Sequence, residues 1–174
     1  MAIIRYLGLL VLLIINGITV SLQAEPVLIT ELSQPPQIKP ASNFELPDLN
    51  DQVFSNQQFM GKVVVLHIWA TWCEPCRQEM PILEQLQQQF PQLVVLGIAE
   101  DSKISVEQFL KQTPLSFPIL IDQFGKLLRD YKIKGFPTTY LINKKGFLTH
   151  FAVGTVDWQN PNIINKIKLL SDNH

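Results

Sequence analysis

Runs of apolar residues along the chain predict strands, and they alternate with segments whose apolar residues recur at helical spacing. Two of these runs, 63–66 within a strongly apolar stretch at 62–69, and 93–98, are continuously apolar. Such runs are typical of central strands covered on both faces of a sheet. Shorter runs predict strands at residues 117–121, 138–142 and 147–153, the last two joined by an Asn-Lys-Lys-Gly turn.

Four helices are predicted between and after these strands. The first begins near Glu74, and the last begins after Asn160, which can cap a helix that has Pro161 at its first position. The other two are short, at residues 106–111 and 124–131.

The order of these elements predicts the fold class. A small hairpin at residues 44–54 precedes the first long strand, and strands and helices then alternate until a closing hairpin and helix. We therefore expect an α/β sandwich with a mixed central β-sheet flanked by helices. The chain has 174 residues, 47% of them hydrophobic, which is enough for one domain with a core.

The first 24 residues have the pattern of an export signal. Arg5 precedes an apolar run at residues 6–20, and Ala24 offers a small residue for cleavage. Residues 1–24 are thus either a signal peptide or a retained N-terminal anchor, and both place the rest of the chain where disulfides persist. Residues 25–40 contain four prolines and predict an extended Pro-rich tether, followed by one domain at residues 41–174.

Candidate chemistry is concentrated where the strand at 62–69 joins the first helix. The sequence there, from His67, is His-Ile-Trp-Ala-Thr-Trp-Cys-Glu-Pro-Cys. It places Cys73 and Cys76 on the first helical turn, where free N–H groups and the helix dipole stabilise a thiolate. A thiolate is the reactive form of cysteine, and the two-residue spacer lets Cys76 resolve a mixed disulfide at Cys73. The pattern predicts thiol–disulfide exchange.

A structural disulfide and half of a zinc site are the other uses of such a pair. Zinc prefers four ligands, whereas the chain has two cysteines and three histidines without ligand spacing. A disulfide across two residues closes too small a loop to constrain the unfolded chain much. We therefore expect no metal and no cofactor. The formal charge of −1 without a basic cluster argues against nucleic acid as a partner.

The run Trp-Ala-Thr-Trp-Cys-Glu-Pro-Cys, with Gly-Phe-Pro-Thr-Thr at residues 135–139, resembles the thioredoxin superfamily. It is most similar to the extracytoplasmic TlpA/ResA/DsbE (CcmG) branch, over about residues 41–170, and Glu79 and the stretch from Glu100 are most like ResA. The resemblance implies a thioredoxin-like sandwich with an N-terminal β-hairpin and the insertion typical of the TlpA-like branch. The Gly-Val-Tyr-Gly-Ala-Pro-Glu run that marks CcmG proper is absent, which weakens an assignment to cytochrome maturation.

Members of this branch reduce protein disulfides outside the cytoplasm, often the haem-attachment cysteines of apocytochrome c. The resemblance therefore implies a disulfide-containing extracytoplasmic protein as substrate and a CcdA- or DsbD-type membrane electron donor. It also implies a location in the periplasm or at the outer face of the cytoplasmic membrane. Membrane contact is expected only if the N-terminal segment is retained.

The resemblance and the local pattern together assign roles within the site. Cys73 is expected to be the exposed nucleophile and Cys76 the shielded, resolving cysteine. Pro137 matches the family's cis-proline, the alternative being a trans proline that starts a strand. Residues expected at the substrate site are Trp72, Glu74, Pro75, Phe136 and Thr138. An ordinary core aromatic is the alternative for Trp72.

Three ionisable residues near the pair have further expected roles. Glu79, one helical turn past Cys76, matches a glutamate that tunes the thiol pKa or relays a proton, with a solvated surface charge as the alternative. Glu74 adds negative charge beside Cys73, which disfavours the thiolate and favours a reductant. His67 is either a proton relay for Cys76 or a buried histidine satisfied by a backbone carbonyl.

Three functions from different classes remain open. The first is a reductase of extracytoplasmic protein disulfides. The second is a disulfide oxidase or isomerase, which would need a stabilised thiolate. The third is a copper-binding partner in metal-site assembly, because thiolates suit Cu(I). A peroxiredoxin is excluded, because no Pro-x-x-x-Thr/Ser-x-x-Cys run precedes Cys73.

Overall fold

The computed structural model describes residues 27–172. The expected signal peptide or anchor, residues 1–24, lies outside the described residues. Within the described part, no helix combines the length and the apolar character needed to cross a bilayer.

A six-stranded sheet forms the centre of the fold, and it is mixed, as the sequence predicts, although its edge strand at residues 39–40 was not expected. Its strands lie in the order β1-β8-β7-β4-β5-β6. They are β1 (Lys39–Pro40), β4 (Val63–Trp69), β5 (Leu93–Ala99), β6 (Ile119–Ile121), β7 (Thr138–Ile142) and β8 (Phe147–Val153). Strand β4 lies inside the sheet, parallel to β5 and antiparallel to β7. All seven of its residues are buried, which accounts for a sequence that is apolar at every position except His67.

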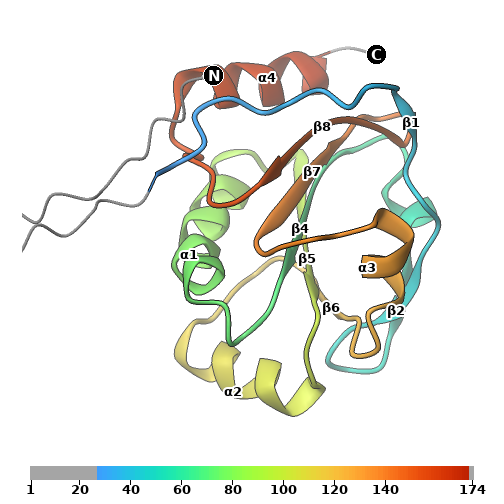
Figure 1. The fold of residues 1–174 in the computed structure, drawn as a ribbon, viewed down its shortest axis with the longest axis vertical. Helices are drawn as coiled ribbons and strands as arrows, with labels where there is room; N and C mark the ends of the chain where they lie inside the picture. The colour runs from blue at the N-terminus through green and yellow to red at the C-terminus, as the bar shows by residue number, and fades with distance from the viewer. Residues whose placement is uncertain (1–26, 173–174) are drawn as a thin grey trace, which may run out of the picture.

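Helices and a hairpin cover the two faces of this sheet (Figure 1). The elements on one face are α1 (Glu74–Gln89), α2 (Lys103–Gln112) and α4 (Pro161–Asp172). Those on the other are α3 (Lys126–Tyr131), a 3-10 helix (Asn56–Phe59) and the hairpin of β2 (Glu45–Pro47) and β3 (Val53–Ser55). The predicted N-terminal hairpin and four helices are thus confirmed.

Side chains of β4 alternate between these two layers. Val65 and Trp69 pack in the layer of α1, α2 and α4, whereas Leu66 and Ile68 pack in the layer of α3 and the hairpin. Because alternate residues of a strand point to the same face, His67 shares the layer of Val65 and Trp69. The strand therefore directs His67 toward the side of the sheet that carries the cysteine helix.

The Pro-rich segment before residue 41 is extended, as predicted, but it is bound to the sheet along much of its length. The Ile29 N–H donates to the Thr155 carbonyl at 2.8 Å, and Ser33 exchanges two backbone hydrogen bonds with Phe151. Further along, β1 pairs antiparallel with β8. Residues from Ile29 onward are therefore hydrogen-bonded to the sheet, ahead of the domain start that the sequence suggests at residue 41.

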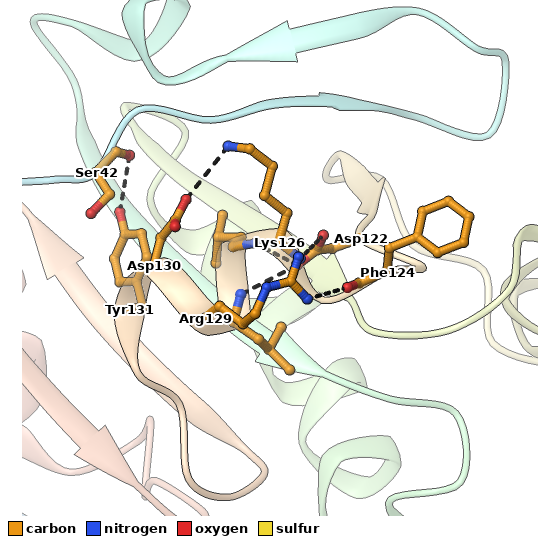
Figure 2. A network of polar contacts seen from close by, with 9 residues as sticks. Ser42, Asp122, Phe124, Lys126, Arg129, Asp130 and Tyr131 are labelled. Atoms are coloured by element: carbon orange, nitrogen blue, oxygen red, sulfur yellow. Dashed lines mark hydrogen bonds and ion pairs between the residues drawn. The ribbon is translucent and has the colours of Figure 1, made fainter.

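Helix α3 begins at Lys126, two residues later than the sequence predicts, and Figure 2 shows the polar contacts that fix it. The Asp122 carboxylate accepts hydrogen bonds from the backbone N–H groups of Lys126, Leu127 and Leu128. A carboxylate at this position satisfies the unpaired donors of the first turn and interacts favourably with the helix dipole. The start of α3 is set by this cap, which leaves Phe124 exposed in the preceding turn.

Candidate active site

The two cysteines lie at the start of α1, just after the short loop that connects it to β4. Cys73 is the N-cap residue of α1, and Pro75 occupies the first turn of the helix. The two sulfurs form a disulfide with an S–S distance of 2.09 Å, and the Cys76 backbone N–H donates to the Cys73 sulfur at 3.3 Å. The predicted strand–CxxC–helix arrangement is present. No cluster of three or more His, Cys, Asp or Glu side chains suited to a metal occurs within residues 27–172.

The two sulfurs have different surroundings. Cys73 borders an open groove of about 680 Å³, with 6% of the residue exposed. Cys76 has no exposed surface and lies on the face of α1 that packs against the core. An attacking thiol of a substrate or donor can therefore reach Cys73 first.

Aromatic and apolar residues form the walls of this groove. Trp72 is 67% exposed and meets Phe136 edge-on, with ring centroids 5.4 Å apart. The alternative that Trp72 is a core aromatic is therefore wrong. Pro75 and Ile133 also line the groove, which gives it an apolar surface next to the reactive sulfur.

Three charged residues also line the groove: Glu74, Glu100 and Lys134. Glu74 is paired with Arg77 at 3.1 Å on the surface of α1. Partial burial, together with the negative charges of Asp122 and Asp101, raises the pKa of the Glu100 carboxyl. The groove thus holds more negative than positive charge beside Cys73.

Pro137 lies directly before β7, next to the groove residue Phe136. The Phe136–Pro137 peptide bond is cis, as the motif predicts. The next residue, Thr138, is buried, and its hydroxyl donates to the Gly135 carbonyl at 2.7 Å. The Thr138 side chain therefore shapes the loop that carries Phe136 and does not itself face the groove.

Glu79 is fully buried, so the alternative of a solvated surface charge is wrong. Its Oε1 accepts hydrogen bonds from the Val156 N–H, at 3.1 Å, and from the Trp158 indole N–H. Its Oε2 has no partner among the described residues. Burial raises the pKa of the Glu79 carboxyl to about 7, although the two hydrogen bonds act in the opposite direction. A carboxyl with this pKa can gain and lose a proton at neutral pH.

His67 is also fully buried, but its partner differs from the predicted backbone carbonyl. Its Nδ1 lies 2.9 Å from the Thr139 hydroxyl of β7, and its Nε2 has no partner in the described part of the chain. Burial lowers the pKa of His67 to about 3, so the imidazole is neutral at physiological pH.

Comparison with known proteins agrees with this geometry. The family model described as AhpC/TSA matches residues 38–151. The chain belongs to the AhpC/TSA family. Thioredoxin-like protein YneN of Bacillus subtilis is 42% identical over 121 residues, which cover 67% of this chain and 71% of YneN. Thiol-disulfide oxidoreductase ResA of Bacillus subtilis is 35% identical over 120 residues, covering 67% of this chain and 66% of ResA.

A solved structure extends the similarity to the whole fold. A DsbE-type thiol:disulfide interchange protein from Chlorobium tepidum superposes with a TM-score of 0.73 at 29% identity, covering 81% of this chain and 99% of that one. This AhpC/TSA member therefore has the thioredoxin-like fold, and its Cys73–Cys76 pair makes it a thiol–disulfide oxidoreductase.

Two sets of contacts in the site were not predicted from the sequence. The segment after β8 supplies both donors to Glu79, and nothing in the sequence pattern around Trp158 indicates this contact. Asp101 accepts from the Thr71 backbone N–H, at 3.2 Å, and from its hydroxyl. The contact between Thr71 and Asp101 could have been predicted from the sequence. Each residue follows one of two adjacent parallel strands, and the ends of such strands lie side by side.

The difference in accessibility predicts which cysteine forms mixed disulfides. Reduced Cys76→Ser should accumulate a stable Cys73 adduct with glutathione disulfide, because the second thiol needed to release it is gone. Reduced Cys73→Ser should form its adduct at least about 100-fold more slowly, because Cys76 is buried. Mass spectrometry of quenched time points measures both rates. Equal rates for the two variants would contradict the assignment.

Burial of Glu79 predicts a loss of stability as pH rises. Between pH 4.5 and about 7 the folded protein keeps a proton that the unfolded chain releases, so the free energy of unfolding falls across this window. Glu79→Gln lacks this fall. Relative to the parent protein, its free energy of unfolding should rise by roughly 3 kcal/mol from pH 4 to pH 8. Urea denaturation of the oxidised proteins measures the difference. Glu74→Gln, at an exposed position, is the control for loss of one charge, and a pH-independent difference for Glu79→Gln would contradict the prediction.

Burial of His67 predicts the opposite dependence, on the acid side. As pH falls from 6.5 toward about 3, the unfolded chain takes up a proton that the folded protein does not, so stability falls. His67→Asn should lack this fall and should keep the rate of thiol–disulfide exchange. Urea denaturation between pH 3.5 and 7, with exchange kinetics at pH 7, tests both points. A collapse in the rate at which Cys76 resolves a mixed disulfide, at unchanged stability, would instead support a proton relay.

Proposed function

We propose that this protein is an extracytoplasmic reductant of protein disulfides. The observation that carries the proposal is the charge around Cys73. Two acidic residues, Glu74 and Glu100, line the groove beside Cys73, against one basic residue, Lys134. Arg77 pairs with Glu74 on the exposed surface of α1 and offsets part of its charge. Negative charge raises the free energy of a Cys73 thiolate, which makes the dithiol less stable relative to the disulfide. A pair in which the disulfide is favoured gives up electrons.

The steps follow from the accessibility of the two sulfurs. The Cys73 thiolate attacks a substrate disulfide, forming a bond to one substrate sulfur while the other leaves as a thiolate and takes up a proton. Cys76 then gives up its proton, attacks the Cys73 sulfur and releases the first substrate sulfur, which is protonated in turn. The protein dithiol is oxidised to a disulfide and the substrate disulfide is reduced to two thiols.

Glu79 is the group we assign to receive the Cys76 proton. It lies three residues after Cys76, and residues at this spacing are neighbours on a helix surface. Both residues are fully buried, so solvent has little access to this proton. The pKa of Glu79, raised to about 7 by burial, matches a group that must accept a proton at neutral pH.

The groove favours a peptide as the substrate. Trp72, Pro75 and Phe136 offer an apolar surface beside Cys73, and the loop before Pro137 offers backbone groups to an extended chain. Disulfide-containing extracytoplasmic proteins, including the haem-site cysteines of apocytochrome c, are the substrates that we propose. The export pattern of residues 1–24 supports action in the periplasm or at the outer face of the cytoplasmic membrane.

Each turnover leaves the protein as a disulfide, so a second dithiol must reduce it. Cys73 is the accessible sulfur for that reaction too, because Cys76 is buried. We propose a CcdA- or DsbD-type membrane transporter as this donor.

The other functions fit the site less well. A disulfide oxidase needs a stabilised thiolate, which Glu74 and Glu100 oppose. Copper delivery needs accessible soft ligands, but Cys76 and Met80 have no exposed surface.

The reduction potential of the Cys73–Cys76 pair tests the proposal. Equilibration of the purified domain with glutathione or dithiothreitol should give a value well below about −200 mV, as for thioredoxin-like reductants. The double variant Glu74→Gln, Glu100→Gln should raise the potential by roughly 10–30 mV, because it removes the charges that oppose the thiolate.

Glu31→Gln is the matched control, since Glu31 is exposed and lines a different surface pocket. A reduction potential of about −120 mV, as in a strong oxidant, would make the protein a disulfide donor and would contradict the reductase hypothesis.

A further inference from the structure

The buried carboxylate of Glu79 has two unequal oxygens. Oε1 accepts two hydrogen bonds, and Oε2, equally buried, has no partner among residues 27–172. An unpaired buried acceptor is costly, so a carboxyl free to rotate would share the donors between its oxygens. Here both donors reach the same oxygen, which leaves the other oxygen free.

The donors come from a segment that is anchored independently of α1. Val156 and Trp158 lie between β8 and α4, and both are buried. The Ile29 N–H donates to the Thr155 carbonyl and the Asp157 N–H donates to the Ile29 carbonyl, so the extended segment around Ile29 holds this segment in place. The Trp158 indole, 2% exposed, is fixed by the surrounding core.

We propose that Trp158 is a positioning residue, whose indole N–H holds Oε1 of Glu79 so that Oε2 remains the oxygen that receives the Cys76 proton. The inference rests on the role of Glu79 in the proposed function. It adds a residue 82 positions beyond Cys76, which bears on the chemistry only through Glu79.

No charged side chain on the described elements around Glu79 acts on its protonation, so the pKa is set by burial first and then by the two hydrogen bonds to Oε1. His67 of β4 is neutral, and the Asp157 carboxylate accepts the backbone N–H of Gln159. Cys76 is held in the disulfide. Burial raises the pKa of Glu79, and the hydrogen bonds from Val156 and Trp158 lower it, with no charged side chain contributing.

A purely structural role for Trp158, anchoring the segment to α1, is the alternative. The two roles separate because only the positioning role links the indole N–H to the proton affinity of Glu79. Trp69 provides a matched control within the same core. It is also fully buried, and its indole N–H has no partner in the described part of the chain.

The test compares Trp158→Phe with Trp69→Phe. Both remove a buried indole, but only the first removes a donor to Glu79. The pKa of the Glu79 carboxyl, measured by ¹³C NMR and assigned with Glu79→Gln, should rise by about one to two units in Trp158→Phe. It should change by no more than a few tenths of a unit in Trp69→Phe.

The rate at which Cys76 resolves a Cys73–glutathione mixed disulfide gives the second readout. Its pH profile should move upward by the same amount in Trp158→Phe, because the carboxylate form of Glu79 is then reached only at higher pH. Incorporating benzothienylalanine at position 158, which keeps the ring shape and replaces the N–H by sulfur, tests the same point if the phenylalanine variant does not fold.

A Trp158→Phe or benzothienylalanine protein with the parent's Glu79 pKa and pH profile overturns the inference. Equal shifts in Trp158→Phe and Trp69→Phe overturn it as well, since they would reflect lost packing. If Glu79→Gln itself leaves the pH profile unchanged, the assignment of Glu79 as proton acceptor fails, and the role of Trp158 fails with it.

Discussion

The pairing of β4 with a parallel strand on one side and an antiparallel strand on the other is the constraint on which the site depends. Parallel pairing with β5 places Glu100 beside the end of β4, where its N–H donates to the Trp69 carbonyl at 2.9 Å. Antiparallel pairing with β7 places Thr138 opposite Ile68, so the loop carrying Pro137 meets the same end. Cys73, Glu100 and Pro137 are therefore brought to one edge of the sheet by hydrogen bonding of the backbone, before any side chain contributes.

Burial of ionisable groups is the second organising feature of the site. Glu79 and His67 lie in the layer beneath α1, and each is disfavoured there in its charged form. The consequences differ because the two groups start from different pKa values. Burial raises the pKa of the carboxyl to about 7, where a proton acceptor is useful at neutral pH. It lowers the pKa of the imidazole to about 3, far below neutral pH. The same physical effect thus prepares one residue for proton transfer and makes the other a neutral core residue.

Much of the fold and of the reactive centre was predictable, because the signals are local. The Cys-x-x-Cys spacing at a strand–helix junction, the Gly-Phe-Pro-Thr-Thr segment and the apolar run of β4 each reflect a neighbourhood of a few residues. The burial of Glu79 and the identity of its donors were not predictable from such patterns. Trp158 is 79 positions away from Glu79, and no periodicity marks a side chain whose function is set by one distant contact.

The contacts of the Pro-rich segment before residue 41 could not be predicted for a similar reason. Prolines at the edge of a sheet and prolines in a free tether give the same sequence pattern, since both favour extended backbone without helix. Only the pairing of β1 with β8 and the contacts of Ile29 distinguish them.

This segment also bears on the active site, because it holds the loop that carries Trp158. The Glu79 carboxylate therefore joins the cysteine helix to the loop after β8, and the segment around Ile29 fastens that loop. A change in the protonation of Glu79 alters hydrogen bonds to a segment that is fastened elsewhere. In the mechanism we propose, the proton needed for disulfide exchange is thus controlled by parts of the chain that lie outside the groove.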